Sequence, residues 1–308
     1  MTQITTSLIQ ELRTKTGAGM MKCKEALVEN NGDIEASIDW LRKKGLAAAS
    51  KKAGRVASEG LVGLMVANGQ GVLVEVNSET DFVARNEQFQ GYVSHVTSLA
   101  LAQEGDMESL KESPYGQGTG RTVSEELKNL IAVIGENMTM RRVGSLSVSP
   151  GVVVGYMHGA ISEGLGKLGV LVALESKGDR AALTALGKQI AMHIAATNPH
   201  SVSVDDLDVA LVNREREIFI SQARESGKPD AVIEKMVEGR LRKFYEESVL
   251  LEQVFVVDGE SKVKDVLKKA EESLGNPVQL VGFLRFALGE GIEKKEDNFA
   301  EEVASLSA

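Results

Sequence analysis

The pattern of apolar and polar residues divides the chain into a helical beginning and a mixed body. In the first 55 residues apolar positions recur three and four residues apart, which indicates helices. Glycine-containing turns separate three such runs. We therefore predict a small three-helix bundle, followed by a polar connector at 43–55. The apolar positions are Ile4, Leu8, Ile9 and Leu12, then Cys23, Leu27 and Val28, then Ile34, Ile38 and Leu41.

From about Glu59 the pattern changes to short runs rich in β-branched residues. Residues 61–67 and 71–77 flank Asn68-Gly69-Gln70 and predict a β-hairpin. The pattern then predicts a helix to about residue 103, a polar loop, a second helix at 123–134 and a strand to about residue 148.

The same order of elements occurs a second time. Residues 152–157 and 169–174 predict another hairpin, in which we align Gly155 with Gly63 and Gly169 with Gly71. A helix at 179–196 follows, and a further helix and strand come much later, at 263–275 and 278–288. We infer two copies of a hairpin, helix, helix, strand unit.

Residues 201–249 interrupt the second copy. This stretch is charged and favours helix, and Ser226-Gly227-Lys228-Pro229-Asp230 breaks it into two halves. We expect an antiparallel helical arm that projects from a two-layer body. The pattern leaves open whether the arm contacts a partner or packs only on itself. Its apolar positions are Ile218, Ala223, Ile233, Met236, Val237, Leu241 and Phe244.

Composition limits the classes of function. The chain has 308 residues and a net charge of −9, which disfavours a general phosphate-backbone binder. A single cysteine, Cys23, excludes an intrachain disulfide and suits a reducing compartment. The N-terminal residues lack a signal-peptide pattern, and no apolar run approaches the length of a membrane span. We expect a cytoplasmic protein without membrane contact.

No catalytic constellation is evident in the sequence. The four histidines have no Cys or His partner at zinc-ligand spacing. The glycine-rich segment 164–169 is the best candidate for a phosphate loop, but Lys167 is followed by Leu168 and then by a strand, which is the wrong order. We expect this segment to be a turn, and we predict that the protein is not an enzyme and uses no metal or cofactor.

The stretch 77–86 lies between the first hairpin and the following helix. It places Asp81 beside Phe82 at a strand-to-helix corner. One interpretation is structural: Thr80 or Asp81 caps the helix, and Phe82 begins its buried face. The other is functional, with Phe82 exposed for a partner. The pattern alone favours the structural interpretation, because buried aromatic residues greatly outnumber functional ones.

Several motifs in order along the chain point to the functional interpretation. Together they closely resemble the bacterial elongation factor Ts family. They are the segments 12–21 (Leu-Arg-Thr-Lys-Thr-Gly-Ala-Gly-Met-Met) and 23–27 (Cys-Lys-Glu-Ala-Leu), 80–84 (Thr-Asp-Phe-Val-Ala), 134–137 (Ile-Gly-Glu-Asn), 192–196 (Met-His-Ile-Ala-Ala), 227–229 (Gly-Lys-Pro), 235–240 (Lys-Met-Val-Glu-Gly-Arg) and 289–293 (Gly-Glu-Gly-Ile-Glu).

The resemblance implies an α+β fold with a defined division of the chain. Residues 1–55 would form a ubiquitin-associated-like three-helix domain with its connector, and 56–149 the first core subdomain. The second core subdomain would comprise 150–200 and 250–288, separated by the coiled-coil arm at 201–249. Residues 289–308 would form a C-terminal helical module. Within the family, the arm serves self-association.

The resemblance also implies a function. The chain would be a guanine-nucleotide exchange factor for the GTPase elongation factor Tu, with Asp81 and Phe82 inserted beside its magnesium and nucleotide site. The implied partner contacts are Met20, Met21, Thr80, Asp81, Phe82, Val83, Ile134, Gly135, His158, Val256 and Val257, the last two within a strand at 255–257. We then expect the Phe82 ring to be exposed.

A different class of function remains as the alternative. The basic connector at 43–55 could make the chain an RNA-binding or structural protein, although the acidic total charge disfavours direct nucleic-acid binding.

Overall fold

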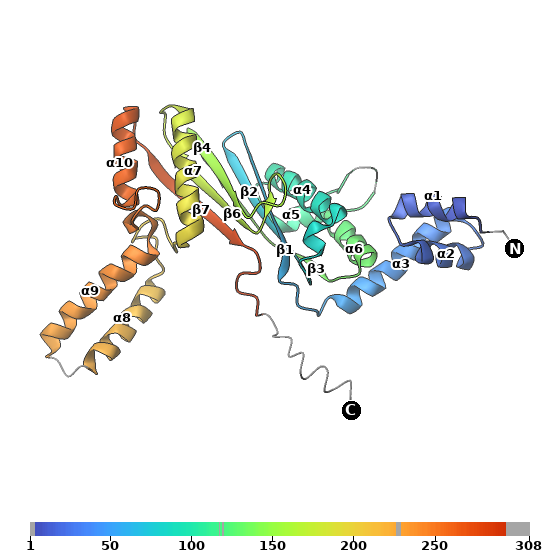
Figure 1. Cartoon of the computed structure of the whole chain (residues 1–308), viewed down its shortest axis with the longest axis horizontal. Coiled ribbons are helices and arrows are strands. Elements are labelled where there is room, and N and C mark those ends of the chain that lie inside the picture. The colour runs from blue at the N-terminus through green and yellow to red at the C-terminus, as the bar shows by residue number, and fades with distance from the viewer. Residues whose placement is uncertain (1–3, 117, 119, 226–228, 294–308) are drawn as a thin grey trace.

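The computed structural model of the chain describes residues 4–116, 118, 120–225 and 229–293. It confirms the predicted α+β class, with a helical unit, a core of two sheets and a helical arm. In Figure 1 the N-terminal helices extend from one end of the core and the arm projects from the other end. Among the described residues, no helix has the length and apolar content that crossing a membrane would need.

The N-terminal unit consists of α1 (Thr6–Thr16), α2 (Met20–Glu29) and α3 (Ile34–Lys52). Thr5 caps α1 and Asp33 caps α3 through their side-chain oxygens. The predicted connector at 43–55 is wrong for most of its length, because α3 continues to Lys52. Alanine and lysine favour helix, and Ala49 is buried in the core of the first subdomain.

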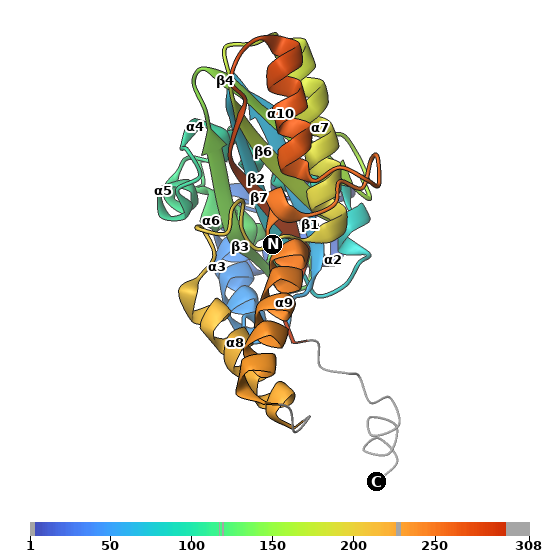
Figure 2. The same ribbon diagram turned by 90° about the vertical axis from the view of Figure 1, so that its left-hand side faces the viewer.

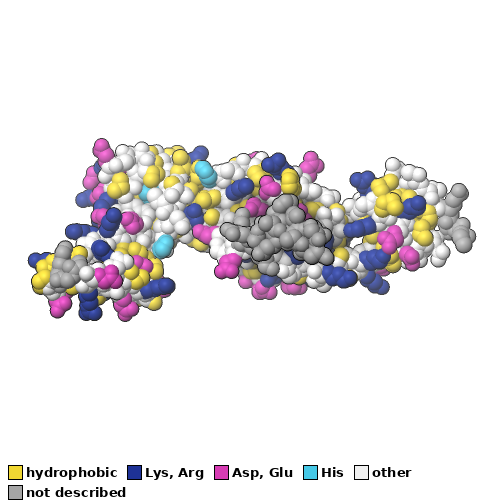
Figure 3. Space-filling view, turned by 60° about the horizontal axis from the view of Figure 1, so that its bottom comes forward, with side chains coloured by type: hydrophobic (Ala, Val, Ile, Leu, Met, Phe, Trp, Pro, Cys, Tyr) yellow, Lys and Arg dark blue, Asp and Glu magenta, His cyan; other side chains and the backbone are white. Residues whose placement is uncertain are grey.

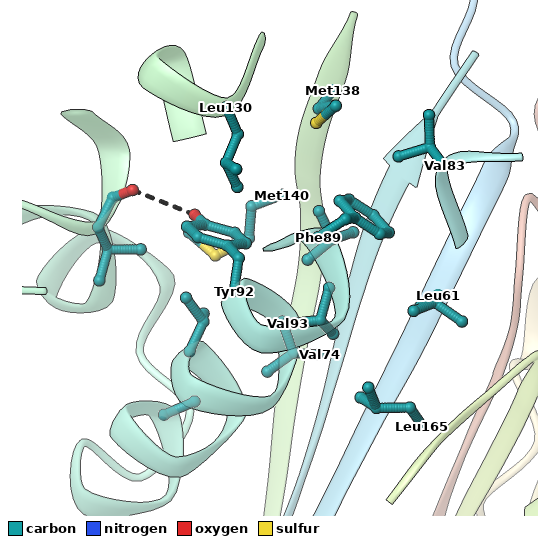
Figure 4. Close-up of a cluster of buried hydrophobic side chains, with 14 of the residues drawn as sticks. Leu61, Val74, Val83, Phe89, Tyr92, Val93, Leu130, Met138, Met140 and Leu165 are labelled. Carbon is teal, nitrogen blue, oxygen red and sulfur yellow. Dashed lines mark hydrogen bonds between the residues drawn. The ribbon is translucent and has the colours of Figure 1, made fainter. Parts of the chain in front are cut away.

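The first subdomain contains β1 (Glu59–Ala67), β2 (Gln70–Ser78) and β3 (Met138–Ser147). One face of its sheet is covered by α4 (Glu87–Ala102), with α5 (Met107–Glu112) and α6 (Val123–Ile134) beside it. Figure 4 shows the core between them, where the fully buried Tyr92 donates a hydrogen bond to the carbonyl oxygen of Val123 (3.1 Å). The short helix α5 lies in the region predicted as a loop.

The second subdomain repeats this arrangement. Its strands are β4 (Gly151–His158), β6 (Leu168–Glu175) and β7 (Gln279–Ala287), covered by α7 (Arg180–Thr197) and α10 (Val263–Leu274). The prediction that segment 164–169 is only a turn is wrong. Residues Leu165–Gly166 form strand β5, which pairs with β1 of the first sheet. Leu165 makes this possible, because its side chain is buried in the first subdomain's core.

The two sheets pack face to face, with the helices on their outer faces (Figure 2). A cluster of apolar residues fills the space between the sheets. Glycines allow close approach there, because a Cβ at Gly71 would lie 2.8 Å from Leu171 and one at Gly169 would lie 2.7 Å from Leu73. The cluster's buried members are Val62, Leu73, Val153, Leu171, Ala173 and Phe286.

The predicted repeat is confirmed, but the alignment of Gly155 with Gly63 is wrong. In the structure the first strands of the two copies correspond with a shift of one residue from that alignment. Gly63 faces the helices, whereas Gly155 faces the other sheet. Alternation along a strand makes a shift of one residue exchange the two faces. The equivalent glycines are Gly60 and Gly151, since both have positive φ and a Cβ at either would collide with the neighbouring strand's backbone.

The arm consists of α8 (Val209–Arg224) and α9 (Asp230–Ser248), which pack against each other. Ala223, Ile233, Val237 and Leu241 are buried between them. Ile218, which we expected in this contact, is exposed. A single 3-10 turn, Leu250–Glu252, leads back to the core. Most of the predicted C-terminal helical module at 289–308 lies outside the described residues.

Candidate partner-binding site

The corner at 77–86 is built by a cap that the sequence analysis missed. β2 ends at Ser78, a 3-10 turn covers Val83–Arg85, and α4 begins at Glu87. The Asn86 side chain accepts hydrogen bonds from the backbone N–H groups of Gln88 (2.9 Å) and Phe89 (3.2 Å). Asn86 is therefore the helix cap, and the prediction that Thr80 or Asp81 caps α4 is wrong.

Burial changes abruptly along the corner, from the exposed Asp81 and Phe82 to the buried Val83 and Ala84. The Phe82 side chain is 74% exposed, whereas Val83 is 3% and Phe89 is 0% exposed. The expected exposure of the Phe82 ring is confirmed, and Asp81 is exposed beside it. Val83 lies in the core with Phe89 and Met138 (Figure 4). Its side chain cannot reach a partner in this structure, and it anchors the corner instead.

The corner is joined to the turn between α6 and β3. The Glu136 carboxylate accepts hydrogen bonds from the backbone N–H (2.9 Å) and the hydroxyl (2.7 Å) of Thr80. The Asn137 N–H donates to the carboxylate of Glu79. Gly135 ends α6 in the left-handed conformation, with φ of 95°. The structure thus places Ile134 and Gly135 beside the corner, although they are distant in sequence.

The N-terminal unit meets the same helix α6. Met20 and Met21 open α2 and are 36% and 76% exposed. The next residue, Lys22, donates to the carbonyl oxygen of Ala132 (2.9 Å), and Lys52 donates to that of Gly135 (2.5 Å). Cations at a helix C-terminus complement its dipole. Figure 3 shows hydrophobic side chains gathered on a face of this unit.

His158 lies in the second subdomain, at the exposed end of β4. Its Nδ1 is 3.1 Å from the hydroxyl of Tyr156, whose ring packs against the core of that subdomain. Tyr156 is partly buried and His158 is exposed, so this contact holds the imidazole at the protein surface.

Val256 and Val257 form a turn, not the strand expected at 255–257. Both are about half exposed. The Val256 N–H donates to Nδ1 of the buried His193 (3.2 Å), whose Nε2 lies 2.9 Å from Oε1 of Gln253. Burial lowers the pKa of His193, which favours the neutral form that this contact requires.

Glu136 and His193 hold two of the predicted contact regions, although neither was predicted as a site residue. Both lie in motifs quoted for the resemblance, and that was their only signal. Hydrogen bonds across the chain, such as Glu136 to Thr80, leave no periodic trace in the sequence.

The described residues offer no evident metal centre. No group of three or more His, Cys, Asp or Glu side chains within 4–116, 118, 120–225 and 229–293 could hold an ion. A cavity of about 290 Å³ lies between the N-terminal helices and α6, lined by Trp40, Arg42 and Lys128 among others.

The exposed apolar residues lie on anchored turns of two related subdomains. This arrangement is typical of proteins that bind a partner.

Comparison with known proteins places the chain within a family. The profile of the family described as Elongation factor TS matches residues 79–290. The chain is 61% identical to Elongation factor Ts of Rhodospirillum centenum over the whole of both chains, and 60% identical to that of Rhodospirillum rubrum over 99% of each. It is 54% identical to that of Allorhizobium ampelinum, over 100% of this chain and 99% of that relative. The chain belongs to the elongation factor Ts family.

Proposed function

We propose that the chain is a guanine-nucleotide exchange factor that binds elongation factor Tu and accelerates GDP release during protein synthesis. Family membership supports the role in translation elongation. The observation that carries the proposal is the 74% exposure of Phe82 on a corner whose next residues are buried. An exposed aromatic ring on an anchored turn is suited to enter a partner's surface.

Exchange requires no catalytic group on this chain. If the chain binds the nucleotide-free GTPase more tightly than the GDP-bound form, it lowers GDP affinity by the same factor. Phe82 would insert between elements near the magnesium site, and Asp81 would disturb the polar groups around the ion. The metal and then the nucleotide would leave.

The other contacts would orient the partner. Met20 and Met21 offer a flexible apolar surface, while His158 and Val256 with Val257 extend the interface to the second subdomain. Side chains in all three regions are exposed, at least in part, in the free chain. Their spread over separate structural units supports a large interface in which Asp81 and Phe82 are one part.

The same proposal covers location and self-association. The protein would act in the cytoplasm, and it would have no enzymatic activity of its own. The arm would associate with a second copy through apolar residues that α8 and α9 leave exposed, such as Val209 and Val232. Sedimentation should then show a mass that rises with concentration, and a constant monomer mass would contradict self-association.

The alternative of RNA binding through 43–55 has less support. These residues are mostly helix α3, and Lys52 is bound to Gly135 while Lys44 pairs with Glu25 (2.7 Å). Such contacts leave fewer cations for phosphates, so we propose no direct nucleic-acid contact.

Calorimetry with purified elongation factor Tu tests the exchange proposal. We expect tighter binding to the nucleotide-free GTPase than to its GDP-Mg²⁺ form. The ratio of the two affinities should equal the factor by which this chain weakens GDP binding. Equal affinities for both forms would contradict the proposal.

A further inference from the structure

We propose that Glu136 is a positioning residue for Phe82. Its carboxylate would fix the backbone directly before Asp81 and Phe82, and so hold the ring in the orientation that the partner meets. The inference rests on the proposed exchange function for its consequence, while the contact itself can be tested on the free protein.

The geometry at Thr80 carries the first step. Both oxygens of Glu136 are used: Oε2 accepts from the backbone N–H of Thr80 at 2.9 Å, and Oε1 accepts from its hydroxyl at 2.7 Å. Hydrogen bonds to an ionised acceptor are stronger than neutral ones. Both residues are partly buried, which limits screening by solvent. One side chain thus fixes both the backbone and the rotamer of Thr80.

The neighbours of Asp81 and Phe82 are fixed as well. Before the pair, the Ser78 hydroxyl donates to the carbonyl oxygen of Thr80 (3.0 Å). After the pair, Val83 and Ala84 are buried. Only Asp81 and Phe82 extend from this frame into solvent. A side chain held in its binding orientation loses less conformational freedom on association.

Glu136 is itself held in place from the N-terminal unit. The preceding residue, Gly135, ends α6, and its carbonyl oxygen accepts from Lys52. The following residue, Asn137, is 4% exposed and donates from its amide to the carbonyl oxygen of Arg55 (2.7 Å). The turn that carries Glu136 therefore connects the end of α3 and the residues after it with the corner.

A fluorescence experiment tests the positioning without any partner. Trp40 is the only tryptophan in the sequence, so Trp40→Phe with Phe82→Trp places the sole indole at the corner. Adding Glu136→Ala should lower the steady-state anisotropy of that indole, because the corner gains freedom. The matched control is Glu108→Ala, which removes only an exposed pair with Lys111, and should leave anisotropy unchanged. Unchanged anisotropy with Glu136→Ala would overturn the inference.

Release of labelled GDP from elongation factor Tu tests the consequence. Losing hydrogen bonds to a charged acceptor should reduce the acceleration by roughly tenfold in Glu136→Ala. Thr80→Val removes only the hydroxyl partner of Glu136 and should give a smaller loss of acceleration. This variant keeps the test decisive where Glu136→Ala folds poorly. Glu136→Gln keeps one acceptor oxygen and should recover part of the acceleration.

Non-additivity separates positioning from a general structural role. In a Phe82→Ala background, adding Glu136→Ala should slow release much less than it does in the unaltered chain, because most of the effect of Glu136 passes through the ring. An equal loss in both backgrounds, or full acceleration by Glu136→Ala alone, would overturn the inference. If the unaltered chain fails to accelerate release, the proposed function fails instead, and the anisotropy result still decides whether Glu136 fixes the corner.

Discussion

Two phenylalanines, Phe82 in the corner and Phe89 in the following helix α4, should lose very different amounts of stability on substitution by alanine. Phe82 is 74% exposed, whereas Phe89 is 0% exposed and lies in the core of the first subdomain. A buried phenylalanine covers about 200 Å² of surface, of which Phe82 buries roughly a quarter. At about 25 cal/mol per Å², Phe82→Ala should cost about 1 kcal/mol of stability. Phe89→Ala should cost about 3–5 kcal/mol, since it also leaves a cavity.

Urea unfolding followed by circular dichroism measures the difference. The two variants and the unaltered protein are compared under identical conditions by their unfolding midpoints. We expect the midpoint of Phe82→Ala to stay close to that of the unaltered protein and that of Phe89→Ala to fall well below it. If Phe82→Ala lowers the midpoint as far as Phe89→Ala does, Phe82 is a core residue, and the reasoning for a partner contact fails.

Two further predictions concern buried polar groups. Glu75 is fully buried and accepts hydrogen bonds from Arg142 (2.5 Å) and Gly289 (2.8 Å). Glu75→Gln should cost about 3 kcal/mol, because Arg141 and Arg142 both lose the buried carboxylate and Arg142 keeps only Glu290 at 3.5 Å, and an unchanged urea midpoint would contradict this. Burial lowers the pKa of His193 below its ordinary value of 6.5, so the unfolded chain binds the proton more readily and stability falls as pH drops below that value. Urea midpoints measured from roughly pH 7 to 5 should show this fall, and a His193→Asn variant that falls equally would contradict it.

The order of elements could be predicted from the sequence because it depends on local patterns. Apolar spacing specified α6 and α10 closely, and the two hairpins showed β-branched runs around short turns. The register of the repeat was less accessible. Gly63 and Gly155 look alike in sequence, but they face opposite sides of their sheets.

Features that depend on contacts across the chain could not be predicted. β5 forms because Leu165 enters the core of the other subdomain. The helix α3 continues past the expected end because Ala49 packs in that same core. At the corner, Asn86 competes with Thr80 and Asp81 as a cap, and the sequence alone does not rank them. Thr80 is instead bound to Glu136, a partner 56 positions away.

The candidate site was accessible chiefly through its motifs. Composition and periodicity favoured a buried Phe82, and the resemblance favoured an exposed one. The structure agrees with exposure, because the 3-10 turn at Val83–Arg85 directs Val83 inward and leaves the preceding ring outside. Val83 belongs to the core. The motif at 80–84 contains both Phe82 and Val83 and does not show which of the two side chains is buried.

The most direct test of the central claim is the rate of labelled GDP release from elongation factor Tu, with the unaltered chain and with Phe82→Ala. We predict that the unaltered chain accelerates release markedly and that Phe82→Ala, although folded, loses most of that acceleration. No acceleration by the unaltered chain would contradict the exchange function. Equal acceleration by both proteins would contradict the role of Phe82.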